Sequence, residues 1–388
     1  QFFSTSDTEV ILKAYIKWGM HAVEKFIGMF AFALFDKRQQ KLIFCRDRTG
    51  IKPSYYYFSD DLILFGSELK SLITHSRFSK EIDLNAVGSF LKHGWIGAPS
   101  SIFKSTFKLK AGHYLEISVK TKEKKECCYW DPHDYYNQPP LDITFQESKE
   151  KLHTLLKSAC EYRMVSDTEV GIFLSGGFDS SLVTAILQNG TAKKISTFSI
   201  GFEEEEFNEA PFARAVANHL GTNHHEVICT AKDAIDLIPS LPFYYDEPFA
   251  DSSAIPTMLV SKLASQHVKV ALSADGGDET FGGYPKYYIK MDELNKIQSI
   301  PSPLKRPFAH LLNLPMNVIG NRNPHYQVLM EKLQKTLLSD KSQDVFKYRS
   351  EPFHYSLREI KKLLPENRTP FLTKTFYDSF NLRGDLHP

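Results

Sequence analysis

The sequence lacks a charge imbalance, a long apolar run and a paired CxxC motif, and each absence excludes a class of protein. Its formal net charge is only +1 over 388 residues, so no general field draws it to nucleic acid or to acidic membranes. The longest apolar run, residues 26–35, is about half the length of a membrane-spanning helix. The five cysteines form no CxxC pair, which favours a reduced, cytoplasmic protein without a zinc site.

Natural-looking ends are also missing from the chain. It begins at Gln1 without a methionine or a secretory signal pattern, inside a patterned segment, and it stops at Pro388. We therefore expect a piece of a longer protein. A hydrophobic content of 42% is ordinary for a soluble protein, and the length suffices for two or three domains.

The first region, residues 1–136, is predicted to be a layered α+β domain. Apolar residues recur at helical spacing near its start, and two pairs of β-rich runs follow, each joined by a short polar turn that indicates a hairpin. This alternation favours antiparallel sheets over a Rossmann unit. The expected strands are 29–36, 41–47, 54–59 and 62–66, and the expected helices are 8–18, 68–75 and 84–92.

The second region, residues 145–388, follows a polar, proline-bearing linker at 137–144 and has a different order of predicted elements. Here short apolar strands alternate with helices, which predicts a parallel sheet covered on both faces. Ligands of such sheets bind beyond the carboxyl ends of the strands. The expected strands are 170–174, 195–202, 224–229 and 268–272, and the expected helices are 145–163, 180–188, 211–220 and 258–266.

The strongest chemical signal is a Ser-Gly-Gly-x-Asp-Ser loop at 175–180, between a predicted strand and a predicted helix. Glycines let the backbone approach an anion, and helix-start amides with serine hydroxyls can donate to phosphate oxygens. Asp179 could hold a magnesium ion that binds the phosphates. No lysine follows the glycines, so the loop is not a GxxxxGK[ST] motif. The plainer alternative is a strand-turn-helix elbow.

A second loop, residues 273–284, follows the predicted strand 268–272 and places three acids, Asp275, Asp278 and Glu279, among glycines. Carboxylates this dense repel one another unless a cation lies among them. A solvated acidic turn would be the better interpretation if the loop stood alone. Beside the loop at 175–180, a shared nucleotide and metal site is favoured.

Both loops resemble those of glutamine-hydrolysing asparagine synthetases, which carry a pyrophosphate loop of the ATP-pyrophosphatase type. The resemblance extends over most of residues 1–290 in the family's order, and it includes a region similar to an Ntn-type (class II) glutamine amidotransferase domain. The other segments that carry it are 6–10, 28–33, 46–53, 198–209, 213–226 and 246–253.

The resemblance implies a substrate set and a role for each matching residue. The substrates would be ATP, aspartate and glutamine, with Mg²⁺ as cofactor, a β-aspartyl-AMP intermediate and asparagine as product; neither nucleic acid nor a membrane would be a partner, and a homodimer is compatible. Asp275 would be catalytic, Asp7 would bind the glutamine ammonium unless it only caps a helix, and Asp179 and Asp278 would share the metal. ATP would contact Phe173, Leu174, Ser175, Gly176, Gly177, Asp179, Ser180, Ile200, Ser273 and Ala274.

Some family features are absent from this sequence. No cysteine or oxyanion Asn-Gly opens it, so we expect this piece to lack glutaminase activity. A phosphate-neutralising lysine is expected beyond Pro388. Residues 246–256 contain no arginine, which some members use to hold the acceptor carboxylate.

Three alternatives to an asparagine synthetase follow from these observations. The first is a related amidotransferase acting on another carboxylate, such as a sugar acid or a secondary metabolite. The second is a tRNA-modifying enzyme, which the near-neutral charge disfavours. The third is a non-catalytic scaffold, which the intact loop at 175–180 disfavours.

Overall fold

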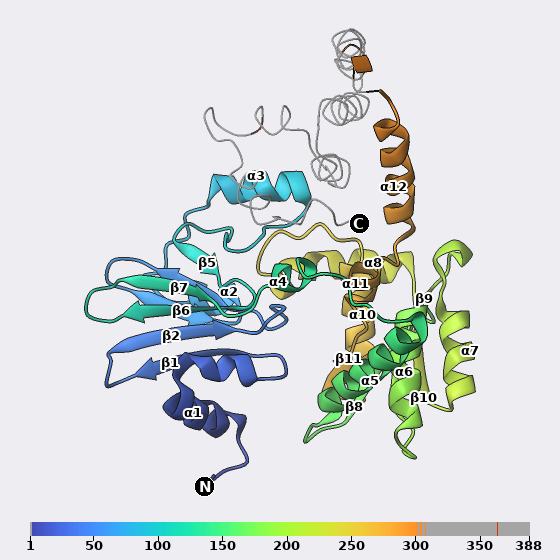
Figure 1. Cartoon of the computed structure of the whole chain (residues 1–388), viewed down its shortest axis with the longest axis horizontal. Helices are drawn as coiled ribbons and strands as arrows, with labels where there is room; N and C mark the ends of the chain where they lie inside the picture. Colours follow the sequence, from blue (N-terminus) through green and yellow to red (C-terminus); the bar gives the residue numbers. More distant parts are fainter. Residues whose placement is uncertain (1, 302, 305–306, 308–362, 364–388) are drawn as a thin grey trace. The chain divides into compact units, whose positions relative to one another are not determined.

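The computed structural model describes residues 2–301, 303–304, 307 and 363, and Figure 1 traces the chain. The chain divides into two compact units. The first holds residues 1–138 together with the short segment Tyr245–Phe249, and the second holds 139–244 and resumes at Ala250. After the acidic residues that follow β11 (Val270–Leu272), the structure describes α12 (Pro285–Gln298) and a few residues beyond it.

The first unit contains a four-stranded antiparallel sheet in the order β1-β2-β6-β7. The first two strands form the predicted hairpin, in which Asp36 pairs with Lys41. Ahead of them lies α1 (Asp7–Trp18), also as predicted, followed by the 3₁₀ segment η1 (Gly19–Lys25). The strands are β1 (Ala31–Asp36), β2 (Lys41–Arg46), β6 (His113–Ser118) and β7 (Lys124–Cys128), of which the last two were not predicted.

A second, three-stranded sheet in the order β4-β3-β5 packs against the first. The contact runs through aromatic rings: Phe44 of β2 stacks on Tyr56 of β3 at 6.0 Å between ring centroids. The predicted hairpin of β3 and β4 is confirmed, and β5 joins it from far along the chain. The elements are β3 (Tyr55–Phe58), β4 (Ile63–Gly66), β5 (Thr106–Lys108), α2 (Leu69–Ile73), α3 (Leu84–His93) and α4 (His133–Tyr136).

A buried carboxylate organises the loop between these two sheets. Asp47 is 1% exposed, and its side chain accepts hydrogen bonds from the backbone amides of Phe30, Ile51 and Lys52 at 2.9–3.3 Å. Next to it, the Arg46 guanidinium donates to three backbone carbonyls. Buried charges are stable in such places because their hydrogen bonds are satisfied.

The second unit is built on the predicted parallel sheet, in the order β10-β9-β8-β11. Its strands are β8 (Val170–Phe173), β9 (Ser196–Phe202), β10 (Asn223–Cys229) and β11 (Val270–Leu272). The helices are α5 (Phe145–Met164), α6 (Phe178–Asn189), α7 (Ala210–Leu220), α8 (Ala231–Leu237), α9 (Leu241–Tyr244), α10 (Ala254–Ser265) and α11 (Gly277–Phe281), with 3₁₀ segments η2 (Glu205–Phe207) and η3 (Ile238–Ser240).

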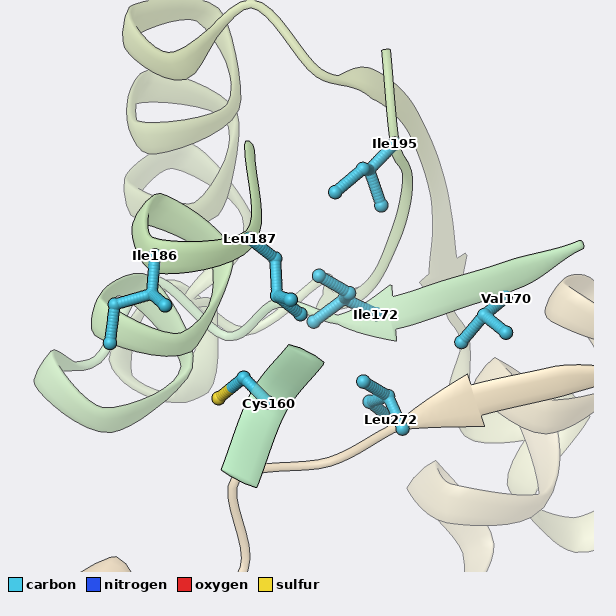
Figure 2. Packing of buried hydrophobic residues seen from close by; sticks show 7 residues of the cluster. All are labelled: Cys160, Val170, Ile172, Ile186, Leu187, Ile195 and Leu272. Atoms are coloured by element: carbon cyan, nitrogen blue, oxygen red, sulfur yellow. The ribbon is translucent and has the colours of Figure 1, made fainter. Parts of the chain in front are cut away.

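One apolar cluster holds β8 and β11 side by side (Figure 2). Val170 and Ile172 of β8 and Leu272 of β11 meet side chains from α5 and α6, namely Cys160, Ile186 and Leu187. On the opposite face, Phe198 of β9 packs against Val260 and Ala264 of α10, together with Phe173 of β8. Neighbouring residues 172 and 173 therefore point to opposite faces, as a strand requires.

Candidate functional site

The carboxyl ends of β8 and β11 lie next to each other. The two strands pair in parallel, with Leu272 opposite Ile172. Because the paired strands end at the same level, the loops that follow them begin at the same edge of the sheet. The two strand-loop patterns in the sequence predicted this arrangement. The loop after β8 is the serine-glycine loop, residues 174–180, and the loop after β11 is the acidic loop, residues 273–284.

Internal hydrogen bonds shape the serine-glycine loop. Leu174 is 1% exposed, and its amide donates to the carbonyl of Phe198, which ties the loop to β9. The hydroxyl of Ser180 accepts from the Ser175 amide at 3.2 Å and lies 3.0 Å from the Ser175 hydroxyl. Gly177 precedes α6 and supplies no side-chain cap, so the amides of the first turn remain open to an anion.

Gly176 shows why this loop needs glycine. Its φ is +86°, and a Cβ there would lie 2.5 Å from the Ala213 nitrogen and 2.7 Å from the Phe212 carbonyl carbon. Both atoms belong to the backbone of α7, so they cannot rotate away. The loop thus packs directly on α7, and any side chain at 176 would push the two apart.

The two loops also contact each other. A Cβ at Gly277 would lie 2.1 Å from Asp179 Oδ2, so the Asp179 carboxylate rests against the backbone of the acidic loop, one residue before Asp278. Within the acidic loop, the Ser273 hydroxyl donates to Asp275 Oδ2 at 2.7 Å. Tyr284 donates to Glu279 at 2.9 Å, and that hydrogen bond, followed by burial, raises the pKa of Tyr284 to about 12.

Both loops line a single cavity of about 830 Å³ within the second unit. Of the predicted nucleotide and metal residues, all except Gly176 border it, and Asp275 borders it too. A third wall, formed by α10, was not predicted, because nothing in the local sequence marks those residues. The further lining residues are Phe178, Phe198, Ser199, Phe202, Glu209, Pro256, Thr257, Val260, Gly276, Gly277, Glu279 and Tyr284.

The charged groups at the cavity suit magnesium only together with a phosphate ligand. Within the described residues no three histidine, cysteine or acidic side chains gather closely enough to hold a metal ion. Asp179 and Asp278 border the same cavity, and Mg²⁺ is commonly held by one or two carboxylates plus substrate phosphates. The residues present therefore fit a magnesium–nucleotide complex better than a free ion.

A largely buried histidine, His224, supports the cavity wall at Ser199. The ring of His224 on β10 lies 2.9 Å from the Thr197 hydroxyl and 3.1 Å from the Ser199 hydroxyl, and both hydroxyl residues are almost fully buried. Burial lowers the pKa of His224, with smaller effects from Glu226, which raises it, and from Arg214 and His225, which lower it.

This histidine predicts a loss of stability in mild acid. Since the folded pKa of His224 lies below the unfolded one, the unfolded chain binds more protons, and the free energy of unfolding falls as the pH drops below about 6.5. Urea unfolding at pH 7.5 and 5.5 should show this fall, and His224→Asn should reduce it. Part of this pH dependence should remain in the variant, because the pKa of His225 is also lowered by burial. An equal pH dependence in the variant would contradict the assignment.

The first unit places two further residues of interest. Asp7 is the first residue of α1, but Ser6 is the N-cap and accepts from the Thr8 amide, so the interpretation of Asp7 as the cap is wrong. Asp7 is exposed and lies in the first turn. Cys45 is buried in β2, and burial raises the pKa of its thiol to about 12, which disfavours a nucleophilic role.

The second unit therefore defines a class: an α/β protein with a glycine loop for an anion and an acidic loop at one edge of a parallel sheet. The chain belongs to the asparagine synthase family, and the model of that family matches residues 151–378. Residues 1–130 match the glutamine amidotransferase domain. Among the described residues, no helix is both long and apolar enough to cross a bilayer.

Curated relatives agree with this family membership. A Methanocaldococcus jannaschii protein, provisionally assigned as a glutamine-hydrolysing asparagine synthetase, is 42% identical over 80% of this chain and 61% of its own length. The glutamine-hydrolysing asparagine synthetase 1 of Bacillus subtilis is 33% identical over 80% of this chain and 48% of its own. The chain thus spans about half to three-fifths of the length of these relatives.

Proposed function

We propose that this chain belongs to an ATP-dependent amide-forming ligase that converts aspartate to asparagine with ammonia from glutamine. The substrate carboxylate would attack the α-phosphorus of ATP and expel pyrophosphate, giving β-aspartyl-AMP. Ammonia would then attack the activated carbonyl and expel AMP. Membership of the asparagine synthase family supports this chemistry.

The observation that carries the proposal is the shared cavity beyond β8 and β11. The serine-glycine loop offers first-turn amides of α6 to phosphate oxygens, and the acidic loop brings carboxylates to the same cavity. Such preorganised donors stabilise charge that develops on a leaving pyrophosphate. A volume of about 830 Å³ lies within the range of small-molecule sites.

Each cavity residue has a distinct task in this scheme. Ser175, Gly176, Gly177 and Ser180 would cradle the pyrophosphate, while Phe173, Leu174, Ile200, Ser273 and Ala274 would border the adenosine. Asp275, held by Ser273, would face the acyl-adenylate and the entering ammonia. Asp179 and Asp278 would hold Mg²⁺, which when bound neutralises the phosphate oxygens. In the first unit, the exposed Asp7 would accept the glutamine ammonium group.

The acceptor is the part of the proposal that needs a direct test, because residues 246–256 contain no arginine to bind a carboxylate. We expect the full-length protein to release pyrophosphate from ATP in the presence of L-aspartate, and to form asparagine with either glutamine or ammonia. A panel of other carboxylates, sugar acids included, serves as the control. Stimulation by another acid and none by L-aspartate would assign the protein to the related amidotransferases instead.

A further inference from the structure

Two neighbouring carboxylates from the later part of the chain are bound inside the first unit. They belong to the segment Tyr245–Phe249, which we term the anchored segment. The side chains of Asp246 and Glu247 are only 8% and 9% exposed. Adjacent acids this deeply buried are rare unless each is paired.

Each carboxylate binds a backbone amide and a lysine, although Lys70 also pairs with Glu68. Asp246 Oδ2 accepts from the Leu69 amide at 2.6 Å, and Oδ1 lies 3.1 Å from Lys70 Nζ. Glu247 Oε1 accepts from the Ile102 amide at 2.7 Å, and Oε2 pairs with Lys108 Nζ.

The lysines differ in exposure, which ranks the two pairs. Lys108 is 15% exposed and also donates to the Ile96 carbonyl at 2.6 Å, whereas Lys70 is 37% exposed. Removing Glu247 would leave a nearly buried cation that keeps its contacts with the Ile96 carbonyl and the Tyr55 ring but loses its carboxylate, which is costly. The Glu247–Lys108 pair is therefore the stronger anchor. Asp246 adds a second attachment point, which sets the direction of the anchored segment.

The anchored segment is tied by a short connection to the cavity wall. Helix α10 begins at Ala254, five residues after Phe249, so the connection spans at most about 18 Å. Its turn is fixed internally, since Asp251 accepts from the amides of Ser253 and Ala254. The first two turns of α10 then present Pro256, Thr257 and Val260 to the cavity.

We propose that Asp246 and Glu247 are positioning residues for the cavity: their attachment to the first unit fixes the start of α10, and with it the wall formed by Pro256 and Thr257. The inference rests on the proposed function only in taking MgATP as the ligand of that cavity. The anchoring carboxylates themselves contact no substrate.

The test uses the full-length protein carrying Asp246→Asn with Glu247→Gln, which keeps the side-chain size while removing both charges. Hydrogen exchange over residues 250–260 should accelerate about tenfold or more, because the start of α10 loses its fixed point. The dissociation constant for MgATP, measured by calorimetry, should rise about fivefold or more, the lower range of a coupling between sites. In kinetics, KM for ATP should rise more than kcat falls.

The matched control is Asp61→Asn, which breaks an exposed ion pair with Arg77 in the same unit and should change none of these quantities. Faster exchange confined to residues 66–72 and 100–108, with 250–260 unchanged, would overturn the proposal and leave the segment as a structural part of the first unit. Should the wild-type protein bind no MgATP, the proposed function fails, and the exchange of residues 250–260 still decides the anchoring role.

Discussion

Asp179→Ala is expected to weaken magnesium-dependent ATP binding about a hundredfold or more, a change of about 2.7 kcal/mol in binding free energy. The Asp179 carboxylate rests against Gly277 of the acidic loop and borders the cavity that both loops share. Without it, the metal would keep only Asp278 and the phosphates, and the phosphate charge at this edge would be less neutralised. Calorimetric titration with ATP, with and without Mg²⁺, measures the effect.

The comparison variant for Asp179→Ala is Glu204→Gln, which removes an exposed acid outside the cavity and should leave binding unchanged. Thermal unfolding should show that the Asp179 variant remains folded, because Asp179 is partly exposed in the first turn of α6 and lies outside the apolar core. ATP binding that is equally tight in the Asp179 variant would refute the assignment of this loop as the nucleotide site.

Gly176→Ala adds only one methyl group, yet it is expected to destabilise the second unit strongly. The new Cβ meets backbone atoms of α7 at 2.5 and 2.7 Å, and alanine at a φ of +86° costs about 1–3 kcal/mol by itself. We expect a total loss of about 3 kcal/mol or more in the free energy of unfolding. Any folded fraction should bind ATP poorly, since the serine-glycine loop must shift away from α7.

Gly190→Ala is the matched control for this substitution. Gly190 follows α6, the same helix, with a φ of −82°, and a Cβ there would meet only carbonyl oxygens at ordinary distances of 3.5 Å or more. Denaturant unfolding should therefore give nearly unchanged stability for Gly190→Ala. If both alanine variants were equally stable, the close packing of Gly176 on α7 would be disproved.

The sequence predicted the elements around the nucleotide loops well because their signals are local. Val170–Phe173 is an apolar strand that runs into glycines, and α6 follows at once; the same holds for Val270–Leu272 and the acidic loop. Equal strand ends in a parallel sheet then bring the loops together, so that Asp179 and Asp278 border one cavity. No long-range information is needed for that inference.

Features that depend on distant contacts could not be predicted in this way. Helix α10 begins at Ala254, four residues before the predicted start, since Asp251 and Ser253 form a turn that periodicity does not detect. Strand β5 is three residues long and is defined only by its pairing with β3. The sequence places Tyr245–Phe249 in the second region, whereas the amides that bind Asp246 and Glu247 lie 177 and 145 residues away in the first unit.

That anchored segment has a consequence for dissecting the protein. A polypeptide ending at Gln138 would omit Glu247, the carboxylate that pairs with the nearly buried Lys108 beside the Tyr55 ring. The first unit is thus discontinuous in sequence, and we expect a polypeptide cut at the interdomain stretch to unfold at a lower temperature for want of that carboxylate. Joining the pentapeptide 245–249 to such a polypeptide by a short covalent graft should restore part of the lost stability.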